Sequence, residues 1–368
     1  MKNRNNLSEP FVRIAKRDDM SFGKRVLVRL VAILLSLAVS AVIIFAITKY
    51  NPVTVYVTMF QGALGTRTRV WSTLKEMFLL TCIAVGLAPA FKMRFWNIGA
   101  EGQVLVGGIV SAGCMIYLTG LPSVALFTIM IISSVLIGAI WGLIPALFKA
   151  KWNTNETLFT LMMNYVAIQF TSFVVSKWEN PYGSNTVGII NQNTRIGWLP
   201  ALFKQQYLLD LLMVIGLVIF MYIYLTKSKH GYEIAVVGES ENTARYAGIN
   251  VKKVFIRTML ISGGICGFAG FLAVSGVSHT ISTSTAGGRG FTAIIVAWLA
   301  KFNTFTMILI SLLLAFLDNG ATEIASKCKL NDYASDMIIG VILFFILGSE
   351  FFINYKLIFR EKTAKEGK

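Results

Sequence analysis

The stretch VLVRLVAILLSLAVSAVIIFAIT at residues 26–48 decides the class of this protein. A helix that crosses the hydrocarbon core of a bilayer needs about 20 mostly apolar residues, and this stretch meets that length. It follows a basic segment that contains Arg13, Lys16, Arg17, Lys24 and Arg25. A cleaved signal peptide would begin nearer residue 1, have a shorter apolar core and end in an A-x-A-like site. We therefore interpret the stretch as a retained transmembrane helix.

The composition of the whole chain agrees with a membrane protein. Of 368 residues, 55% are hydrophobic and 14% are charged, and the mean hydropathy is +0.66. Soluble domains are about a quarter charged, so this chain has too few charges for a cytosolic enzyme. The net charge of +16 comes without the interleaved basic and aromatic pattern of a base-stacking surface. We assign it to cytoplasmic loops that face anionic lipid, and expect membrane lipid but no nucleic acid as a partner.

Further apolar runs along the chain predict a bundle of helices. They are Trp71–Phe91, Ile98–Leu118, Pro122–Phe148, Thr157–Val175, Tyr207–Thr226, Val254–Val277, Phe291–Ala300, Phe302–Leu317 and Met337–Phe359. The sequence therefore predicts an all-α polytopic membrane helix bundle with about ten transmembrane segments. The run Phe291–Ala300 is short for a full crossing, so it is interpreted as a broken or half-crossing helix.

The distribution of charge orients this bundle. With the N-terminus in the cytoplasm, inside segments carry 24 of the 34 Lys and Arg residues and outside segments carry 10. Positive residues favour the cytoplasmic side, so both termini are predicted to be cytoplasmic. The predicted organisation is an N-terminal tail at 1–25, a transmembrane domain at 26–359 and a C-terminal tail at 360–368. A basic cytoplasmic loop spans 227–253.

The stretch Phe95-Trp96-Asn97-Ile98-Gly99-Ala100-Glu101-Gly102-Gln103 is the first polar constellation. Asn97 is a plausible N-cap, and Glu101 falls in or near the first turn of the following helix, where a carboxylate is favoured. One interpretation is a helix start whose acidic residue complements the helix dipole. The other is a broken helix whose polar groups line a substrate path, as discontinuous helices do in carriers.

The second polar constellation is the stretch Asn155-Glu156-Thr157-Leu158-Phe159-Thr160-Leu161-Met162-Met163-Asn164-Tyr165. Thr160 and Asn164 are four residues apart and share one helix face. An amide inside a membrane helix needs a partner, so Asn164 either bonds to another helix or lines a cavity.

A short helix is predicted in the middle of the basic loop. Ser240 is a good N-cap, Glu241 suits the first turn, Arg245 the last turn, and Gly248 the position after the C-cap. About two turns are too few for a helix that is stable alone in water. The segment therefore lies on the membrane surface or docks on a partner. Its weak apolar moment favours a protein partner.

Motifs for catalysis and for metal binding are missing from the sequence. The glycine-rich stretch at Gly287, Gly288 and Gly290 leads into an apolar segment but is no phosphate loop, because GxxxxGK[ST] occurs nowhere in the chain. The chain holds no nucleophile elbow, no HExxH and no CxxC. We therefore expect no enzyme activity, no bound metal and no cofactor. The GxxxG spacings Gly138–Gly142 and Gly263–Gly267 predict close helix packing.

The stretch from Trp96 to Gln103 resembles the signature of permease subunits in bacterial ABC importers for nucleosides and simple sugars, within the broad group that also serves branched-chain amino acids. The stretches Glu156–Tyr165, Gly231–Gly248 and Gly288–Ala297 resemble further motifs of that family, in the same order. The resemblance covers about residues 25–355. Ala235 and Ser240 depart from it, since family members often have Arg and Asn there.

The resemblance implies a multi-pass protein of the bacterial cytoplasmic membrane that imports nucleosides. Its implied partners are an ABC ATPase that uses ATP and Mg²⁺, a second permease (a different chain) and an extracellular substrate-binding lipoprotein. The implied substrate path contains Phe91, Trp96, Asn97, Glu101, Gln103 and Asn164. The implied ATPase-coupling residues are Gly238, Glu241, Asn242, Ala244, Arg245 and Gly248.

Two other functions stay open at this point. The same machinery could import a simple sugar such as ribose. A secondary carrier would instead use Glu101 or Asp318 as a proton site and would stop when an uncoupler is added. An intramembrane enzyme is disfavoured because the chain shows no catalytic constellation.

Overall fold

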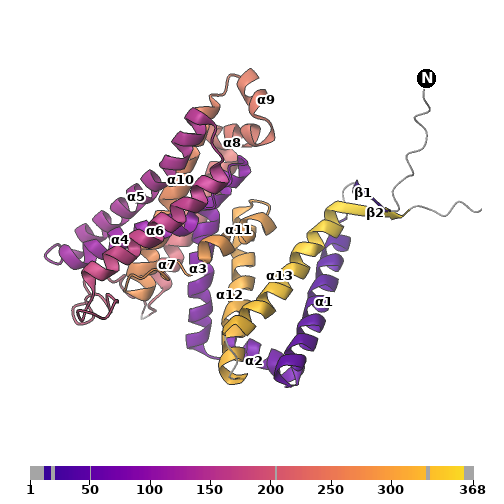
Figure 1. Cartoon of the computed structure of the whole chain (residues 1–368), viewed down its shortest axis with the longest axis horizontal. Helices are drawn as coiled ribbons and strands as arrows, with labels where there is room; N and C mark the ends of the chain where they lie inside the picture. The colour runs from indigo at the N-terminus through magenta and orange to yellow at the C-terminus, as the bar shows by residue number, and fades with distance from the viewer. Residues whose placement is uncertain (1–11, 18–20, 50, 204, 329–331, 360–368) are drawn as a thin grey trace, which may run out of the picture. The chain divides into compact units, whose positions relative to one another are not determined.

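The computed structural model describes residues 12–17, 21–49, 51–203, 205–328 and 332–359 (Figure 1). The chain divides into two compact units, one formed by residues 66–316 and one by residues 1–65 and 317–368. The predicted tail at 360–368 and most of the tail at 1–25 lie outside the described residues.

The larger unit, residues 66–316, contains the predicted functional motifs. Its elements are α3 (Arg67–Lys92), α4 (Ala100–Tyr117), α5 (Ser123–Trp152), α6 (Glu156–Trp178), α7 (Leu208–Lys227), α8 (Lys229–Glu239), α9 (Glu241–Tyr246), α10 (Val251–Phe271), η1 (Leu272–Ser278), α11 (Arg289–Leu299) and the first part of α12 (Thr304–Cys328).

Polar side chains set the starts of several of these helices. Asn155 accepts a hydrogen bond from the backbone N–H of Leu158 at the start of α6, and Asn250 accepts one from Lys253 at the start of α10. A capping oxygen satisfies one of the backbone N–H groups that have no partner inside the helix. These caps therefore fix where the chain enters each helix.

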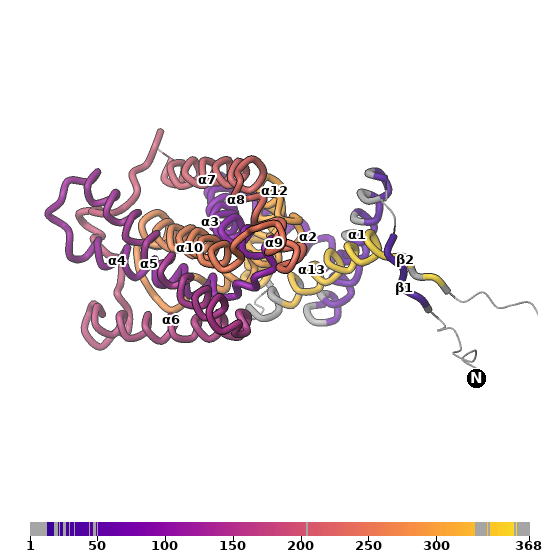
Figure 2. The backbone as a smooth tube through the Cα atoms, turned by 90° about the horizontal axis from the view of Figure 1, so that it is seen from above, coloured from indigo at the N-terminus to yellow at the C-terminus, as the bar shows by residue number. Residues whose placement is uncertain are grey.

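Helix α10 forms the centre of this unit. Seen from above, it lies between α5 and α3 (Figure 2), and it also packs on α4. The predicted GxxxG spacings make the closest of these contacts. A Cβ atom on Gly138 would overlap the Gly263 carbonyl oxygen, and one on Gly267 would overlap the Ser134 carbonyl oxygen. The prediction of close helix packing at these glycines is confirmed.

The chain breaks its helical path after α10. The last turns form a π-helix, η1, and His279 then takes a left-handed conformation with φ 53°. After a loop the chain continues in α11, which has 11 residues. At 1.5 Å per residue α11 is about 16 Å long, about half the thickness of the hydrocarbon core. Its length agrees with the predicted broken or half-crossing helix.

The smaller unit contains the two ends of the described chain. Its elements are β1 (Val12–Lys16), α1 (Phe22–Thr48), α2 (Pro52–Leu64), the last part of α12, α13 (Asp332–Asn354) and β2 (Tyr355–Phe359). Helix α1 packs on α13, and β1 pairs with β2 in an antiparallel ladder.

The described residues are mostly helical, as predicted, and β1 and β2 add one short two-stranded sheet. One prediction about secondary structure is corrected. The predicted crossing Met337–Phe359 ends at Asn354, and its last five residues form β2. The segment Tyr-Lys-Leu-Ile-Phe is rich in aromatic and branched side chains, which suit a strand as well as an apolar helix end.

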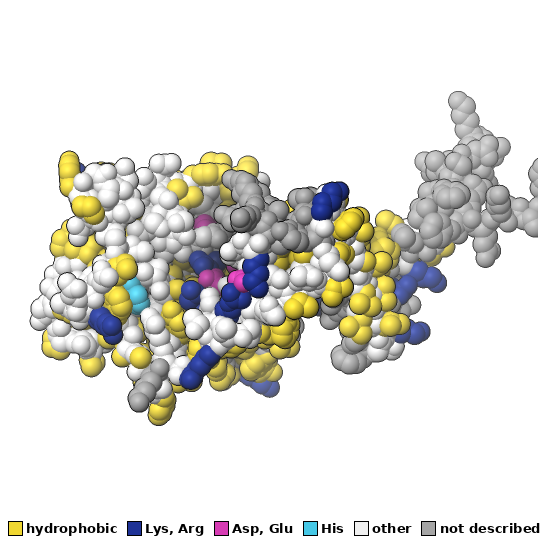
Figure 3. Space-filling model, turned by 90° about the horizontal axis from the view of Figure 1, so that it is seen from below, with side chains coloured by type: hydrophobic (Ala, Val, Ile, Leu, Met, Phe, Trp, Pro, Cys, Tyr) yellow, Lys and Arg dark blue, Asp and Glu magenta, His cyan; other side chains and the backbone are white. Residues whose placement is uncertain are grey.

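The structure supports a helical membrane bundle. Among the described residues, seven helices are long and apolar enough to cross a membrane, and shorter apolar helices cover Leu30–Ile43, Arg289–Leu299 and Ile339–Asn354. Large apolar side chains such as Leu136, Phe173 and Phe220 are exposed, and the face seen from below carries separate patches of hydrophobic side chains (Figure 3). The exposed apolar side chains suit contact with lipid. The total of about ten segments and the side of each terminus stay predictions.

Candidate functional site

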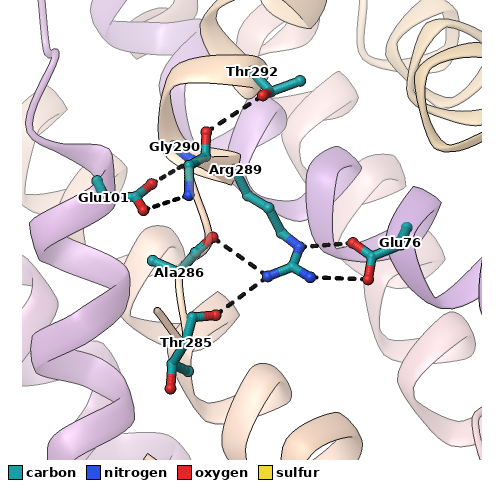
Figure 4. Close-up of polar contacts among 8 residues, drawn as sticks. Glu76, Glu101, Thr285, Ala286, Arg289, Gly290 and Thr292 are labelled. Atoms are coloured by element: carbon teal, nitrogen blue, oxygen red, sulfur yellow. Dashed lines mark hydrogen bonds and ion pairs between the residues drawn. The ribbon is translucent and has the colours of Figure 1, made fainter. Parts of the chain in front are cut away.

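A carboxylate from another helix holds the N-terminus of α11. Glu101, in the first turn of α4, accepts hydrogen bonds from the backbone N–H groups of Gly288 at 2.7 Å and Gly290 at 2.8 Å, one on each oxygen (Figure 4). Only 6% of Glu101 is exposed. The first N–H groups of a helix have no partner inside it and favour an anion. Glu101 therefore supplies the cap that the N-cap residue Gly288 lacks.

An ion pair ties the same helix start to α3. Arg289 donates from Nε and Nη2 to the two carboxylate oxygens of Glu76, at 2.7 and 2.8 Å (Figure 4). Its Nη1 also donates to the carbonyl oxygens of Thr285 and Ala286, at 3.2 and 3.3 Å. A two-pronged arginine–carboxylate pair fixes both distance and orientation. We call Glu76, Glu101 and Arg289 the α11 clamp.

One member of the α11 clamp, Glu76, lies well inside α3, a helix that is long and apolar enough to cross a membrane. Glu76 is nine residues into α3, which corresponds to roughly 14 Å along the helix axis. Charged side chains at such depth are costly and usually mark functional regions. Carriers also place their sites at the ends of discontinuous helices. These properties make the α11 clamp and its surroundings the candidate functional site.

Close approach between α4 and α11 requires a glycine at 290. A Cβ atom there would lie 2.5 Å from the Glu101 backbone nitrogen and 2.8 Å from its Cα. Neither backbone atom can move away without displacing α4. The Gly-Arg-Gly sequence at 288–290 therefore serves this approach, while the arginine between the glycines forms the ion pair with Glu76.

A second polar group joins the start of α4 to α10. The Asn97 side-chain amide donates to Ser262 Oγ at 3.1 Å and to Gln103 Oε1 at 3.2 Å, and Gln103 Nε2 donates back to Asn97 Oδ1 at 3.2 Å. All three residues are buried. Asn97 Oδ1 also accepts from the Gly99 N–H at 3.1 Å. The N-cap of α4 is Gly99, which corrects the predicted N-cap Asn97 by two residues.

Asn164 attaches the segment around the start of α4 to α6. Its side chain accepts from the Gly102 N–H at 2.8 Å and donates to the Ile98 carbonyl oxygen at 2.8 Å. One turn earlier, Thr160 accepts from the Ile98 N–H at 3.1 Å. The amide therefore bonds between helices in this structure, the first of the two interpretations of its pattern.

Aromatic rings gather beside these polar groups. The indoles of Trp96 and Trp298 stack with centroids 5.4 Å apart and planes at 25°, and they are 42% and 44% exposed. Phe91, which is 3% exposed, meets both indoles nearly edge-on, at 5.8 and 6.4 Å. Phe302 meets Trp298 at 5.5 Å. The ring cluster of Phe91, Trp96, Trp298 and Phe302 thus combines a buried ring, Phe91, with two half-exposed indoles.

The loop between α7 and α10 forms two short helices. Ser240 accepts from the Thr243 N–H at 3.2 Å and caps α9, Arg245 pairs with Glu241 at 3.2 Å, and Gly248 has a left-handed φ of 77°. The predicted cap, charges and helix end are confirmed. Helix α9 projects from one end of the larger unit in Figure 1.

This segment is attached to the bundle by α8. Glu233 accepts from Arg257 Nη2 of α10 at 2.8 Å, and this bond lowers the pKa of the Glu233 carboxyl. Gly238 packs so closely that a Cβ atom would overlap the Lys92 carbonyl oxygen. Helix α8 is therefore attached to α10 and to the end of α3, and it connects α9 to these two helices.

Comparison with known families decides the family of the chain. Residues 69–347 match the family described as "Branched-chain amino acid transport system / permease component", which covers more than half of the chain. The chain belongs to this permease family. The match includes the α11 clamp, the ring cluster and the α8–α9 segment.

Three similar permeases span most of this chain. The nucleoside ABC transporter permease NupB of Lactococcus lactis subsp. cremoris is 29% identical over 93% of this chain and 94% of its own length. The guanosine ABC transporter permease NupP of Bacillus subtilis is 29% identical over 88% and 93%. The glucose ABC transporter permease TsgB13 of Haloferax volcanii is 28% identical over 92% and 90%. No solved structure matches significantly.

Five of the six predicted path residues of this permease fall within residues 91–103, and the sixth, Asn164 of α6, bonds to the Gly102 N–H. Four of them are buried polar residues that bond to the chain itself: Asn97, Glu101, Gln103 and Asn164. Phe91 is buried beneath the indoles, and only Trp96 is exposed. Contact of these six residues with substrate stays a prediction.

Sequence reasoning missed Glu76, Arg289 and Trp298 as members of this site. Arg289 lies inside the stretch Gly288–Ala297 that resembles a family motif, and Trp298 directly follows it, but neither residue was assigned a role at a site. Glu76 had no local signal, except that it is a carboxylate within an apolar run.

The predicted coupling residues divide by exposure. Ala244 and Gly238 are buried against the permease itself. Exposed residues are Glu241, Asn242, Arg245 and Gly248. Tyr246, which sequence reasoning passed over, is 93% exposed. A role in ATPase coupling stays a prediction for this set.

Proposed function

We propose that this permease is the transmembrane subunit of an ATP-driven importer in the bacterial cytoplasmic membrane, and that it carries nucleosides. The observation that supports this most is the alignment of nucleoside and guanosine permeases with 88–93% of the chain. A glucose permease aligns nearly as well, at 28%. A simple sugar is therefore the second candidate substrate.

The proposal assigns ATP hydrolysis to a partner. The chain has no phosphate loop of its own, and the α8–α9 segment has the properties of a docking element. In this proposal an ATPase subunit, which binds ATP and Mg²⁺, contacts α9. A second permease of different sequence completes the pathway, and an extracellular lipoprotein delivers the substrate. The permease itself supplies the path.

Uptake in a deletion strain tests the substrate. We expect loss of labelled guanosine uptake when the gene is deleted, with glucose and ribose uptake unchanged, because the nucleoside permeases are the better-supported relatives. Restoring the gene on a plasmid restores uptake. Loss of ribose or glucose uptake with normal guanosine uptake would instead assign the permease to a sugar importer.

An exposed tyrosine tests the docking role of α9. Tyr246 contacts little of the permease, since it is 93% exposed. Buried tyrosines are frequent hot spots of interfaces, where truncation costs about 2 kcal/mol or more. Tyr246→Asp is therefore expected to lower substrate-stimulated ATP hydrolysis at least about tenfold in the reconstituted importer, without changing the amount of folded permease.

A tyrosine on a different loop is the matched control. Tyr182 is 96% exposed between α6 and α7, and Tyr182→Asp should leave stimulated ATP hydrolysis unchanged. Ala244→Asp is no substitute for Tyr246→Asp, because Ala244 is buried and a charge there would disturb the packing of α9 itself. Normal stimulation in Tyr246→Asp would contradict docking through this face.

A further inference from the structure

The two half-exposed indoles of Trp96 and Trp298 form what we call the indole platform. Their rings belong to different elements, since Trp96 lies in the loop before α4 and Trp298 near the end of α11. They stack at 5.4 Å, and the buried Phe91 contacts both from beneath. Two large aromatic surfaces are thus left partly uncovered in a permease whose nearby polar side chains are buried.

The indole platform is held rigidly from both sides. On the Trp96 side, the backbone of Ile98 is tied to α6, because its N–H donates to Thr160 Oγ1 at 3.1 Å and its carbonyl oxygen accepts from Asn164 at 2.8 Å. Trp298 is carried by α11, whose start is fixed by Glu101 and Arg289. A surface that is already ordered loses little entropy when a ligand binds. The α11 clamp therefore acts as a positioning device for the Trp298 ring.

The indole N–H groups of the platform are also available to a ligand as hydrogen-bond donors. Within the described residues, neither indole N–H of the platform has a hydrogen-bond partner, whereas those of Trp178 and Trp198 donate at 2.8 Å. A tryptophan has one donor and no acceptor. A ligand that suits the platform combines a flat face that can lie on an indole with acceptor atoms at its edge. A nucleobase has both.

We propose that the indole platform is the base-binding site of the transport path, with the nucleobase lying against the exposed indoles and accepting from an indole N–H. Trp298 is then a specificity-determining residue for nucleosides. This inference rests on the proposed function, because it assumes that the cargo contains a base. Stacking on aromatic side chains tolerates different bases, so the site accepts nucleosides as a class.

The inference is tested in the complete importer, reconstituted in vesicles with its ATPase, second permease and binding protein. The readout is the number of labelled guanosine molecules imported per ATP hydrolysed, which a defect in assembly alone does not change. Trp298→Leu removes the aromatic face and should lower this ratio at least about tenfold. Trp298→Phe keeps a ring and should retain most of it. Trp96→Leu should behave like Trp298→Leu, and it decides the question if Trp298→Leu does not assemble.

Trp152 provides the matched control for the lipid contacts that exposed tryptophans make. It is 57% exposed at the end of α5, with its ring 5.0 Å from Phe148. Trp152→Leu should leave the ratio unchanged. A normal ratio in both platform variants, or an equal fall in Trp152→Leu, would overturn the base-binding site. If the unmodified importer moves no nucleoside at all, the proposed function itself is wrong, which is a different result.

Discussion

Replacing Glu101 by alanine is expected to abolish measurable transport. The carboxylate accepts from two backbone N–H groups of the α11 start, and it is buried. A hydrogen bond to a charged group contributes about 1.5–3 kcal/mol, and a donor left buried without a partner costs a similar amount. Loss of both bonds therefore costs about 3 kcal/mol or more, which corresponds to uptake at least about 100-fold lower if α11 must hold its place.

Two carboxylate variants separate this effect from general instability. Glu101→Gln keeps one acceptor oxygen but turns the other position into a donor that faces an N–H group, so intermediate uptake is expected. Glu179 accepts from the backbone N–H of Asn185 at an exposed position. Glu179→Ala should therefore leave uptake near normal. Uptake of labelled guanosine, normalised to permease in the membrane, measures all three. Full uptake in Glu101→Ala would show that the clamp is dispensable.

Replacing Gly267 by leucine is expected to prevent correct folding of the larger unit. A Cβ atom on Gly267 would overlap the Ser134 carbonyl oxygen and lie 3.0 Å from the Gly138 Cα. Both neighbours are backbone atoms of α5, so α5 and α10 would have to separate along their closest contact. Overpacking a well-packed core costs about 1–3 kcal/mol even when side chains can adjust. Here the atoms in the way belong to the backbone, so no change of side-chain rotamer can relieve the overlap. We expect loss of the folded permease in detergent, measured by size-exclusion chromatography and thermal unfolding.

A glycine of another spanning helix is the control for this substitution. Gly216 lies in α7, and a Cβ atom there would meet nothing within 4 Å. Gly216→Ala should therefore be tolerated and should even stabilise the helix slightly, since alanine is favoured over glycine by about 1 kcal/mol. Gly267→Ala should already lower the melting temperature. Equal stability of the two alanine variants would contradict the described helix crossing.

Local signals were sufficient to predict most helices and one cap. Apolar length located the spanning helices because the bilayer core has a fixed thickness. Ser240 as N-cap and Gly248 after the C-cap both depend on neighbours within a few residues, and the structure confirms both. The strands β1 and β2 escaped prediction, because a pair of five-residue strands far apart in the chain leaves no periodic pattern long enough to distinguish from an apolar helix end.

The partners within the candidate site could not be derived from spacing. Glu101 was correctly placed in the first turn of α4, yet its carboxylate caps a helix that begins at Arg289. Glu76 meets Arg289 across a comparable separation in sequence. Such pairings depend on how α3, α4 and α11 pack together. The residue types of Trp96–Gln103 indicated that this stretch forms a polar site. Only the fold shows which side chain is the hydrogen-bond partner of which.

The packing of α1 on α13, with β1 paired to β2, has a consequence for biosynthesis. The ribosome makes α1 early and α13 late, so α1 enters the lipid long before its partner helix exists. The apolar side chains of α1 make it stable in the bilayer as a single inserted helix until α13 has been made. The unit formed by the two ends of the described chain can therefore close only after translation has passed β2.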